Sequence, residues 1–432
     1  MKKMRRNRKV TSCNSDRGVV ITLVAVFMLF VMGAMAALSI DVVALYTARS
    51  EAQLAADAGA LAGARVLANS GATSDPNLLL METSSGGSAS VVAIEVATQN
   101  DVGGTPATAT VSFDTVSVRN PKVTVQVSTN TLPTFFSRIW GTTQLSVTAR
   151  AKAEAYNPTP DGSAVVLPPT ATICVKPWVL PNMDPRDPTG NTTIFNPASG
   201  AVTTPNPSLV NFRSTGSNPR MSTVCPPGSS CATTGPATLK YYPLDLSTFP
   251  APSSVPECSP ALITPYQQGI AGCIPVPISC NDQVPLDLNR YDTRDSEATD
   301  AINCLTHANR NGGDTIGSSP PAAPFVFVGG SGNPIPGTDD KDLMVSDSLV
   351  TVPVYDNTAG GPPTSTVQIV GFVRLFLNFL GRPTPTTGPN TYHTRIAIID
   401  LIGCGGGIGA RSGTPILGNG SSPIAVRLIS PN

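Results

Sequence analysis

The feature that most constrains the fold is an uninterrupted apolar run near the N-terminus. Residues 18–40 give 23 consecutive positions without a charged side chain. A helix of that length spans the roughly 30 Å hydrocarbon core of a bilayer. Residues 1–17 carry seven Lys and Arg against one acid, Asp16. Because basic flanks stay on the cytoplasmic side, the sequence predicts a cytoplasmic tail (1–17), one transmembrane helix (18–40) and an exported remainder.

Two other interpretations of this segment involve cleavage. A secretory signal peptide has the same basic and apolar regions, and Ala34-Met35-Ala36 is an acceptable cleavage site. However, the run is long for a signal peptide, and the helical pattern continues beyond it. Prepilin-type cleavage after Gly18 is a second alternative, but prepilins usually carry Glu five residues past the cut, where this chain has Leu23. We therefore favour a retained anchor.

The residues after the apolar run predict a helical stalk over 41–70. This stretch contains no Pro and is dominated by Ala, the strongest helix former. Its polar residues recur three or four positions apart and therefore share one face: Tyr46, Arg49, Gln53 and Asp57. Gly59 and Gly63 form a small-xxx-small pair that lets another helix approach closely. That helix belongs either to the chain's own domain or to a partner subunit, and the sequence leaves both alternatives open.

The stalk also carries a specific motif. Asp41 follows the apolar run, Tyr46 and Arg49 follow at fixed intervals, and residues 52–64 read AQLAADAGALAGA. This pattern resembles the N-terminal region of the TadE/TadG-like Flp (Tad) pilus-assembly family over about residues 16–70. The resemblance implies a bacterial inner-membrane protein of the Tad/Flp pilus secretion machinery. It also implies a minor pilin or assembly factor that contacts membrane lipid and other pilus subunits through its N-terminal helix.

Nothing in the sequence predicts a cofactor, a metal or a catalytic centre. Some longer TadG-like proteins carry a von Willebrand A domain with an Asp-x-Ser-x-Ser metal motif, which Asp245-Leu246-Ser247 does not complete here. The chain has only two histidines, His307 and His393, so few general bases are available. Charged residues make up 13% of the chain and the net charge is zero, which argues against nucleic-acid binding.

Residues 71–156 predict a small pilin-like α+β module. A helix is expected over 88–100, and the alternation of apolar and polar residues predicts strands at 107–113, 122–127 and 144–155. An amphipathic helical turn is expected over 132–140. Residues 157–169 are rich in Pro and predict a linker.

Residues 170–432 predict a β-rich exported domain, so the fold class of the whole chain is α+β. Short apolar runs separated by Pro and Gly turns indicate strands at 171–175, 193–195, 325–328, 350–354, 367–380, 394–401 and 424–429.

Eight of the nine cysteines follow the linker: Cys174, Cys225, Cys231, Cys258, Cys273, Cys280, Cys304 and Cys404. The ninth, Cys13, precedes the anchor and should be reduced. An even number confined to the exported region predicts disulfides. Cys225–Cys231 and Cys273–Cys280 are plausible local pairs. Zinc held by Cys304 and His307 is the less favoured alternative, because no second ligand pair has finger-like spacing.

Three functional hypotheses follow. The first is a structural or assembly component of a Tad-type pilus, acting by helix packing. The second is a membrane-tethered, adhesin-like binding module whose anchor serves only as a tether. The third, an exported hydrolase, has the least support, because no nucleophile motif accompanies the two histidines.

Overall fold

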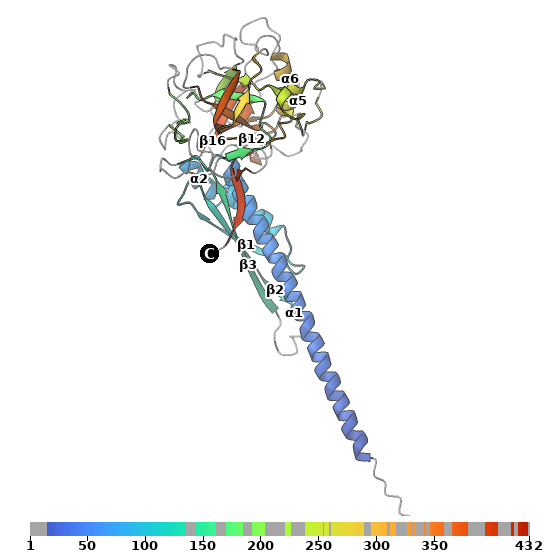
Figure 1. Ribbon diagram of the computed structural model, residues 1–432. Coiled ribbons are helices and arrows are strands. Elements are labelled where there is room, and N and C mark those ends of the chain that lie inside the picture. The colour runs from blue at the N-terminus through green and yellow to red at the C-terminus, as the bar shows by residue number, and fades with distance from the viewer. Residues whose placement is uncertain are drawn as a thin grey trace, which may run out of the picture.

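A computed structural model of the protein describes residues 15–134, 141, 144–160, 170–184, 192–203, 221–225, 238–253, 255–258, 261–288, 295–308, 312–316, 326–330, 332–333, 341–342, 346–357, 365–378, 394–404, 416–418 and 422–430. A long helix extends from the N-terminal end of the described residues to the base of the head (Figure 1). A small sheet packs along its second half, and a β-rich head sits at its far end. This arrangement confirms the predicted α+β fold class.

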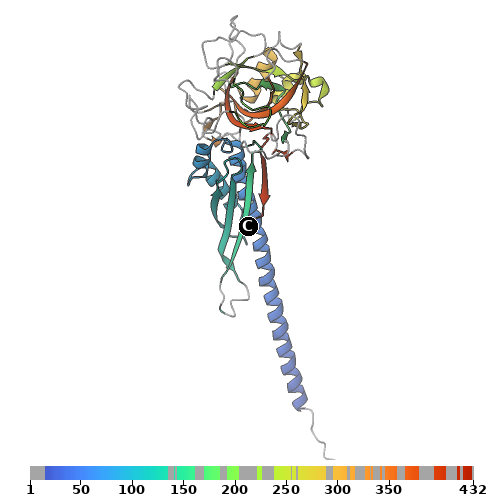
Figure 2. The same ribbon diagram turned by 60° about the vertical axis from the view of Figure 1, so that its left-hand side comes forward.

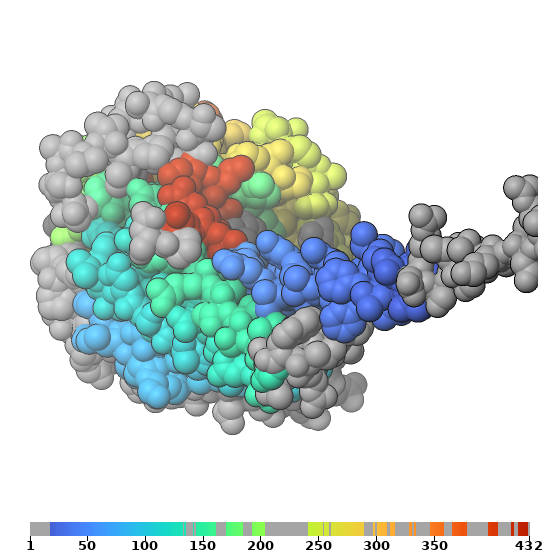
Figure 3. All heavy atoms as spheres, turned by 90° about the horizontal axis from the view of Figure 1, so that it is seen from below, coloured from blue at the N-terminus to red at the C-terminus, as the bar shows by residue number. Residues whose placement is uncertain are grey.

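Helix α1 (Ser15–Asn69) is one continuous element of 55 residues, which corresponds to about 80 Å at 1.5 Å per residue. It confirms the prediction that the apolar run and the stalk form a single helix. Most side chains from Gly18 to Thr47 are exposed, with Leu29 at 72%. From Ala48 onward, one face is buried against the sheet. In a view from below, α1 in blue passes beside the cyan and green strands (Figure 3).

Two short helices follow α1. Helix α3 (Ser88–Thr98) confirms the helix predicted over 88–100. Helix α2 (Pro76–Thr83) was not predicted, although its start signal is present in the sequence. The Asp75 carboxylate accepts a hydrogen bond from the Asn77 amide at 2.9 Å, and Pro76 occupies the first turn.

The first sheet is antiparallel with the strand order β1-β2-β3-β18. Its strands are β1 (Thr108–Asp114), β2 (Lys122–Pro133), β3 (Gln144–Tyr156) and β18 (Ala425–Ile429). Alternation places Val123, Val125 and Val127 in the core beneath α1 and α3, while the intervening polar residues face outward. These strands confirm the alternation signals. The helical turn expected over 132–140 is wrong at its start, because Leu132 extends β2; residues 135–140 lie outside the described residues.

The last strand of the sheet comes from the far end of the chain. β18 pairs with β3, and the pairing aligns Asp114, Lys122, Glu154 and Arg427 in one row across all four strands. Lys122 lies 3.6 Å from Asp114, and Arg427 lies 2.6 Å from Glu154. The two ion pairs in this row, with signs alternating from strand to strand, favour the observed register. β18 falls within the predicted C-terminal domain in the sequence. In the structure it belongs to the first sheet and not to the head.

The head contains an eight-stranded sheet with the order β7-β6-β16-β15-β14-β5-β8, with β10 paired to β15. Its strands are β5 (Trp178–Pro181), β6 (Met221–Cys225), β7 (Thr238–Lys240), β8 (Tyr242–Pro243), β10 (Gln283–Pro285), β14 (Leu349–Tyr355), β15 (Thr366–Asn378) and β16 (Thr394–Gly403). Only Tyr241 separates the two end strands, β7 and β8, in the chain. Their proximity curls the sheet toward a closed ring (Figure 2).

Smaller elements complete the head. They are β4 (Thr170–Thr172), β9 (Ile278–Ser279), β11 (Thr315–Ile316), β12 (Val326–Val328), β13 (Lys341–Asp342), β17 (Ile416–Leu417), the helices α5 (Pro265–Ala271) and α6 (Asp295–Leu305), and the 3-10 turn η2 (Leu246–Thr248). The predicted strands at 350–354 and 394–401 are confirmed, and the strand predicted at 367–380 is confirmed as far as Asn378, beyond which residues 379 and 380 lie outside the described residues. The strand predicted at 193–195 is wrong, because Phe195 makes only an isolated bridge with Val202.

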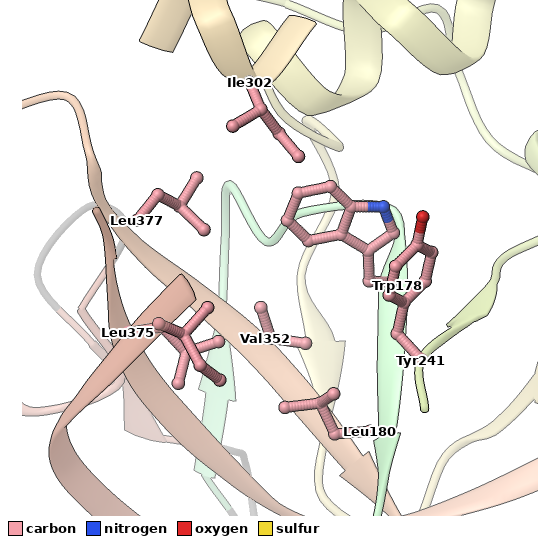
Figure 4. A pocket seen from close by; sticks show the side chains of 8 residues that line it. Trp178, Leu180, Tyr241, Ile302, Val352, Leu375 and Leu377 are labelled. Carbon is pink, nitrogen blue, oxygen red and sulfur yellow. The ribbon is translucent and has the colours of Figure 1, made fainter. Parts of the chain in front are cut away.

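The interior of the head is apolar. Trp178, Leu180, Tyr241 and Val352 converge with Leu375 and Leu377 under Ile302 of α6 (Figure 4). The remaining space is about 10 Å³, enough for at most one water molecule. Because its lining is apolar, we expect this space to be dry. Its volume is too small for a ligand.

Candidate functional site: the stalk helix and its joint with the head

The stalk motif occupies two different faces of α1. Tyr46 is 71% exposed, and Arg49 and Leu54 also face outward. Asp41 is buried, at 5% exposure. The motif therefore leaves an open face just beyond the apolar run, while its small residues pack inward.

The glycine pair is used inside the chain. A Cβ at Gly59 would lie 2.7 Å from the Ala93 carbonyl oxygen and 2.9 Å from the Ala97 Cβ, both on α3. A Cβ at Gly63 would lie 3.0 Å from the Ala93 Cβ. Of the two alternatives left open by the sequence, the structure shows the packing of this pair against a helix of its own domain.

Two polar residues of the motif connect the stalk to β3. The Gln53 amide donates to the Asp57 carboxylate at 2.8 Å and to the Arg150 carbonyl oxygen at 3.3 Å. Arg150 lies just beyond the β3 segment that pairs with β18. Gln53 therefore covers part of an otherwise open strand edge, which protects it from pairing with other chains.

A third contact, from Glu51, was not predicted. Its carboxylate accepts a hydrogen bond from the Gly103 amide at 2.7 Å. Gly103 has φ +61°, and a Cβ there would lie 2.3 Å from Leu132. The contact fixes the loop between α3 and β1 against the stalk.

The end of α1 meets the head in a buried polar cluster, which we call the joint: Asn69, Thr73, Ser74, Asn157, Arg374 and Asp400. Arg374 on β15 and Asp400 on β16 are paired directly across the two strands. The Arg374 guanidinium donates to the Asn69 side chain and, at 3.5 Å, to the Ala68 carbonyl oxygen. A cation of the head thus caps the C-terminal end of α1, where the helix dipole favours positive charge.

Asp400 accepts hydrogen bonds from the other side of the joint. The Thr73 hydroxyl donates to its carboxylate at 3.1 Å, and the Ser74 hydroxyl donates to it as well. The Asn157 amide donates to Thr73 at 3.2 Å and to the Leu401 carbonyl oxygen at 3.3 Å. The first residue of the predicted linker is therefore buried between the two parts of the molecule.

Burial sets the electrostatics of the joint. Desolvation lowers the pKa of Arg374 to about 10, and the carboxylate of Asp400 opposes this shift. Arg374 therefore remains charged at neutral pH. A buried charge with these partners holds one geometry, because any displacement would remove hydrogen bonds that water cannot replace.

Six of the predicted cysteines form three disulfides: Cys174–Cys273, Cys258–Cys304 and Cys280–Cys404. The predicted Cys273–Cys280 pair is wrong, because the two residues bond to distant partners. Sequence proximity did not identify partners that the sheets bring together from 99 and 124 residues away. Cys231, and with it the predicted Cys225–Cys231 pair, lies outside the described residues, as does Cys13.

We expect non-reducing peptide mapping to recover these three linkages. Cys280→Ser should lower the free energy of unfolding by about 2–4 kcal/mol, because it opens a long loop in the unfolded chain. Cys404→Ser should give the same loss, and the double variant should lose no more than either single variant. A peptide linking Cys273 to Cys280 would contradict this arrangement.

The Cys304-x-x-His307 pair does not form a zinc site. Cys304 is bonded to Cys258, and His307 Nδ1 lies 2.7 Å from the Asp314 carboxylate. Among the described residues, no group of three or more His, Cys, Asp or Glu is arranged to hold a metal. His307 lies two residues beyond α6 and has φ +49°.

The contact between His307 and Asp314 makes the stability of the head depend on pH. The hydrogen bond to Asp314 raises the pKa of His307, and burial opposes the rise. A raised folded pKa contributes stability that is complete below the unfolded pKa, about 6.5, and is lost as pH rises through the folded value. The unfolding free-energy difference between wild type and His307→Gln should therefore be larger at low pH than at high pH. A difference that grows toward alkaline pH would contradict this assignment, and in an Asp314→Asn background the pH dependence should largely disappear.

These features define a class of protein: a single long helix with an apolar, uncovered first half, a compact module on its second half, and a disulfide-linked head. Among the described residues, α1 is the one helix with the length and composition needed to cross a membrane. Residues 18–66 match the model of the putative Flp pilus-assembly TadE/G-like family, which confirms the resemblance of the N-terminal region. No curated protein and no solved structure matches the chain. The family match and the apolar helix together fit a membrane-anchored pilus component.

Proposed function

We propose that the protein is a minor pilin-like structural or assembly component of a Tad/Flp-type pilus or secretion apparatus. The observation that supports this most is the coincidence of the family match, residues 18–66, with one continuous helix. The first half of this helix is bare and apolar, and its second half organises the core of the module. We place its basic tail in the cytoplasm and its head in the periplasm or outside the cell, because basic residues precede the span and disulfides follow it.

In this proposal both halves of the helix take part in assembly. Residues 18–40 hold the protein in the bacterial inner membrane and pack against the membrane helices of partner subunits. Partner subunits contact the exposed positions beyond the span, including Val43 (63% exposed), Tyr46 and Leu54 (66% exposed). The joint then holds the head at a fixed position relative to the membrane. The protein acts through these protein–protein contacts and not by catalysis.

An exchange of the anchor separates this proposal from an adhesin-like tether. Residues 18–40 are replaced by an unrelated transmembrane helix of equal length, and the variant is expressed in a deletion strain of the producing bacterium. We expect normal membrane insertion but loss of pilus assembly, because the native helix also contacts partners. Full pilus assembly with the foreign helix would show that the anchor serves only as a tether. Variants of Tyr46 and Leu54 in the native anchor should reduce assembly without changing membrane insertion.

A further inference from the structure

The outer face of the first sheet carries a hollow that the proposed assembly role does not use. Its walls are formed by Thr110 and Ser112 on β1, Thr124 and Gln126 on β2, and Arg150 and Lys152 on β3. The register places Thr110, Gln126 and Arg150 in one row, and Ser112, Thr124 and Lys152 in the next. α1 and α3 cover the opposite face of the sheet.

The two cations in this hollow differ from their neighbours in the adjacent row. In the row of Asp114, Lys122, Glu154 and Arg427, each positive charge has an acidic neighbour. Arg150 donates to the Gln126 amide oxygen at 2.7 Å, and neither Arg150 nor Lys152 makes an ion pair with another described residue. The hollow therefore carries two positive charges that have no direct ion pair among the described residues, because Glu154, the acid two positions from Lys152 on β3, is paired with Arg427.

The distance from the anchor argues against lipid headgroups as the source of negative charge. The Arg150 carbonyl oxygen contacts Gln53, which follows the end of the apolar run, Ile40, by 13 residues. A helix rises about 20 Å over that distance. Charges at the membrane surface are screened within about 8 Å at physiological ionic strength.

The chemistry of the walls distinguishes between two kinds of anionic polymer, an acidic polysaccharide and an acidic peptide. Hydroxyl and amide side chains both donate and accept hydrogen bonds, and four such groups line the hollow. A polymer that carries hydroxyls and carboxylates matches both properties of the hollow. An acidic peptide side chain only accepts hydrogen bonds, so it could use the two cations and the hydroxyl donors but would leave the acceptor atoms of the walls unused.

We propose that this face of the sheet binds an acidic polysaccharide, with Arg150 and Lys152 contacting its carboxylates and the flanking Thr, Ser and Gln side chains contacting its hydroxyls. The site lies on the stalk module, by which we mean the second half of α1 with α3 and the first sheet, away from the interior of the head. It gives the anchored protein a contact with an anionic polymer on the exported side of the membrane.

The test uses the full chain in nanodiscs of zwitterionic lipid and measures binding of polygalacturonate, neutral dextran and polyglutamate. We expect polygalacturonate to bind, with an affinity that falls as salt rises, and dextran to show no binding. Arg150→Gln combined with Lys152→Gln should weaken binding about tenfold or more, because it removes two charge contacts. Arg49→Gln with Arg65→Gln, two exposed cations on α1, is the control of equal net charge and should bind as wild type does.

A second variant tests the hydroxyl contacts. Thr110→Val with Thr124→Val keeps the shape and strand propensity of both positions. It should weaken polygalacturonate binding several-fold and weaken any polyglutamate binding less, because polyglutamate side chains use the hydroxyls only as donors. The proposal is overturned if the Arg150→Gln/Lys152→Gln variant binds polygalacturonate as tightly as the Arg49→Gln/Arg65→Gln control. It is also overturned if polyglutamate binds as tightly as polygalacturonate, or if binding requires anionic lipid in the nanodisc. Thermal unfolding of each variant confirms that the fold is retained.

Discussion

Replacing Arg374 by methionine is expected to lower the free energy of unfolding by about 3–5 kcal/mol, because it leaves the buried Asp400 carboxylate without a neighbouring positive charge. Arg374 is 3% exposed and Asp400 is fully buried, and the two are paired across β15 and β16. The variant also loses the donors to Ala68 and Asn69 at the end of α1. Denaturant unfolding of the full chain in detergent measures the loss.

The matched control for this variant is Arg427→Met. Arg427 also pairs with an acid, Glu154 at 2.6 Å, but its side chain is 62% exposed. Glu154 is buried, but it keeps Lys122 opposite it on β2 when Arg427 is replaced, so the control should lose less stability than Arg374→Met. We also expect Arg374→Met to increase protease cleavage after Tyr156, because the joint covers Asn157. Equal, small losses in both variants would show that the joint does not hold the head on the stalk.

Replacing Gly59 by leucine should destabilise the stalk module by about 3 kcal/mol, the upper range for overpacking a core. The Cβ alone would lie 2.7 Å from a backbone oxygen of α3, so α3 must move away from α1. Because α3 also covers the sheet, its displacement exposes core residues such as Ala93 and Val125. Unfolding measured by circular dichroism, together with hydrogen exchange in α3, follows this change.

Gly33→Leu is the control for the glycine prediction. Gly33 lies on the bare half of the same helix, and a Cβ there meets nothing within 4 Å. The stability of the folded module should therefore be unchanged. If Gly59→Leu were tolerated as well as Gly33→Leu but abolished recovery of partner subunits, the glycine pair would face another chain and not α3.

The sequence predicted the elements whose signals are local. The uncharged run and the Ala-rich stretch gave the continuous helix α1, and the period-two alternation gave β1, β2 and β3. The apolar stretches 350–354, 367–380 and 394–401 gave the three central strands of the head. In each case the pattern is carried by the element's own residues, and it can be read without knowing what packs there.

Features that join distant segments could not be predicted. The disulfide Cys280–Cys404 depends on which segments the head brings together, and the return of β18 to β3 pairs residues 273 positions apart, such as Glu154 and Arg427. The joint was partly indicated by the sequence, since the charged residues Arg374 and Asp400 interrupt strongly apolar strands. Such charges predict a buried partner, but the sequence does not identify the end of α1 as that partner. The assignment of residues 157–169 as a linker and of the domain boundaries remains a proposal, to which the structure adds the burial of Asn157.

Site-specific photocrosslinking in the producing bacterium tests the central claim most directly. A crosslinking amino acid is placed at Tyr46, on the open face of α1, and as a control at Val116, which is 96% exposed in the turn between β1 and β2. We predict that the Tyr46 position yields adducts with pilin-like or other Tad-type assembly subunits and that the Val116 position does not. Adducts absent from both positions, or equal at both, would contradict a role in pilus assembly through the N-terminal helix.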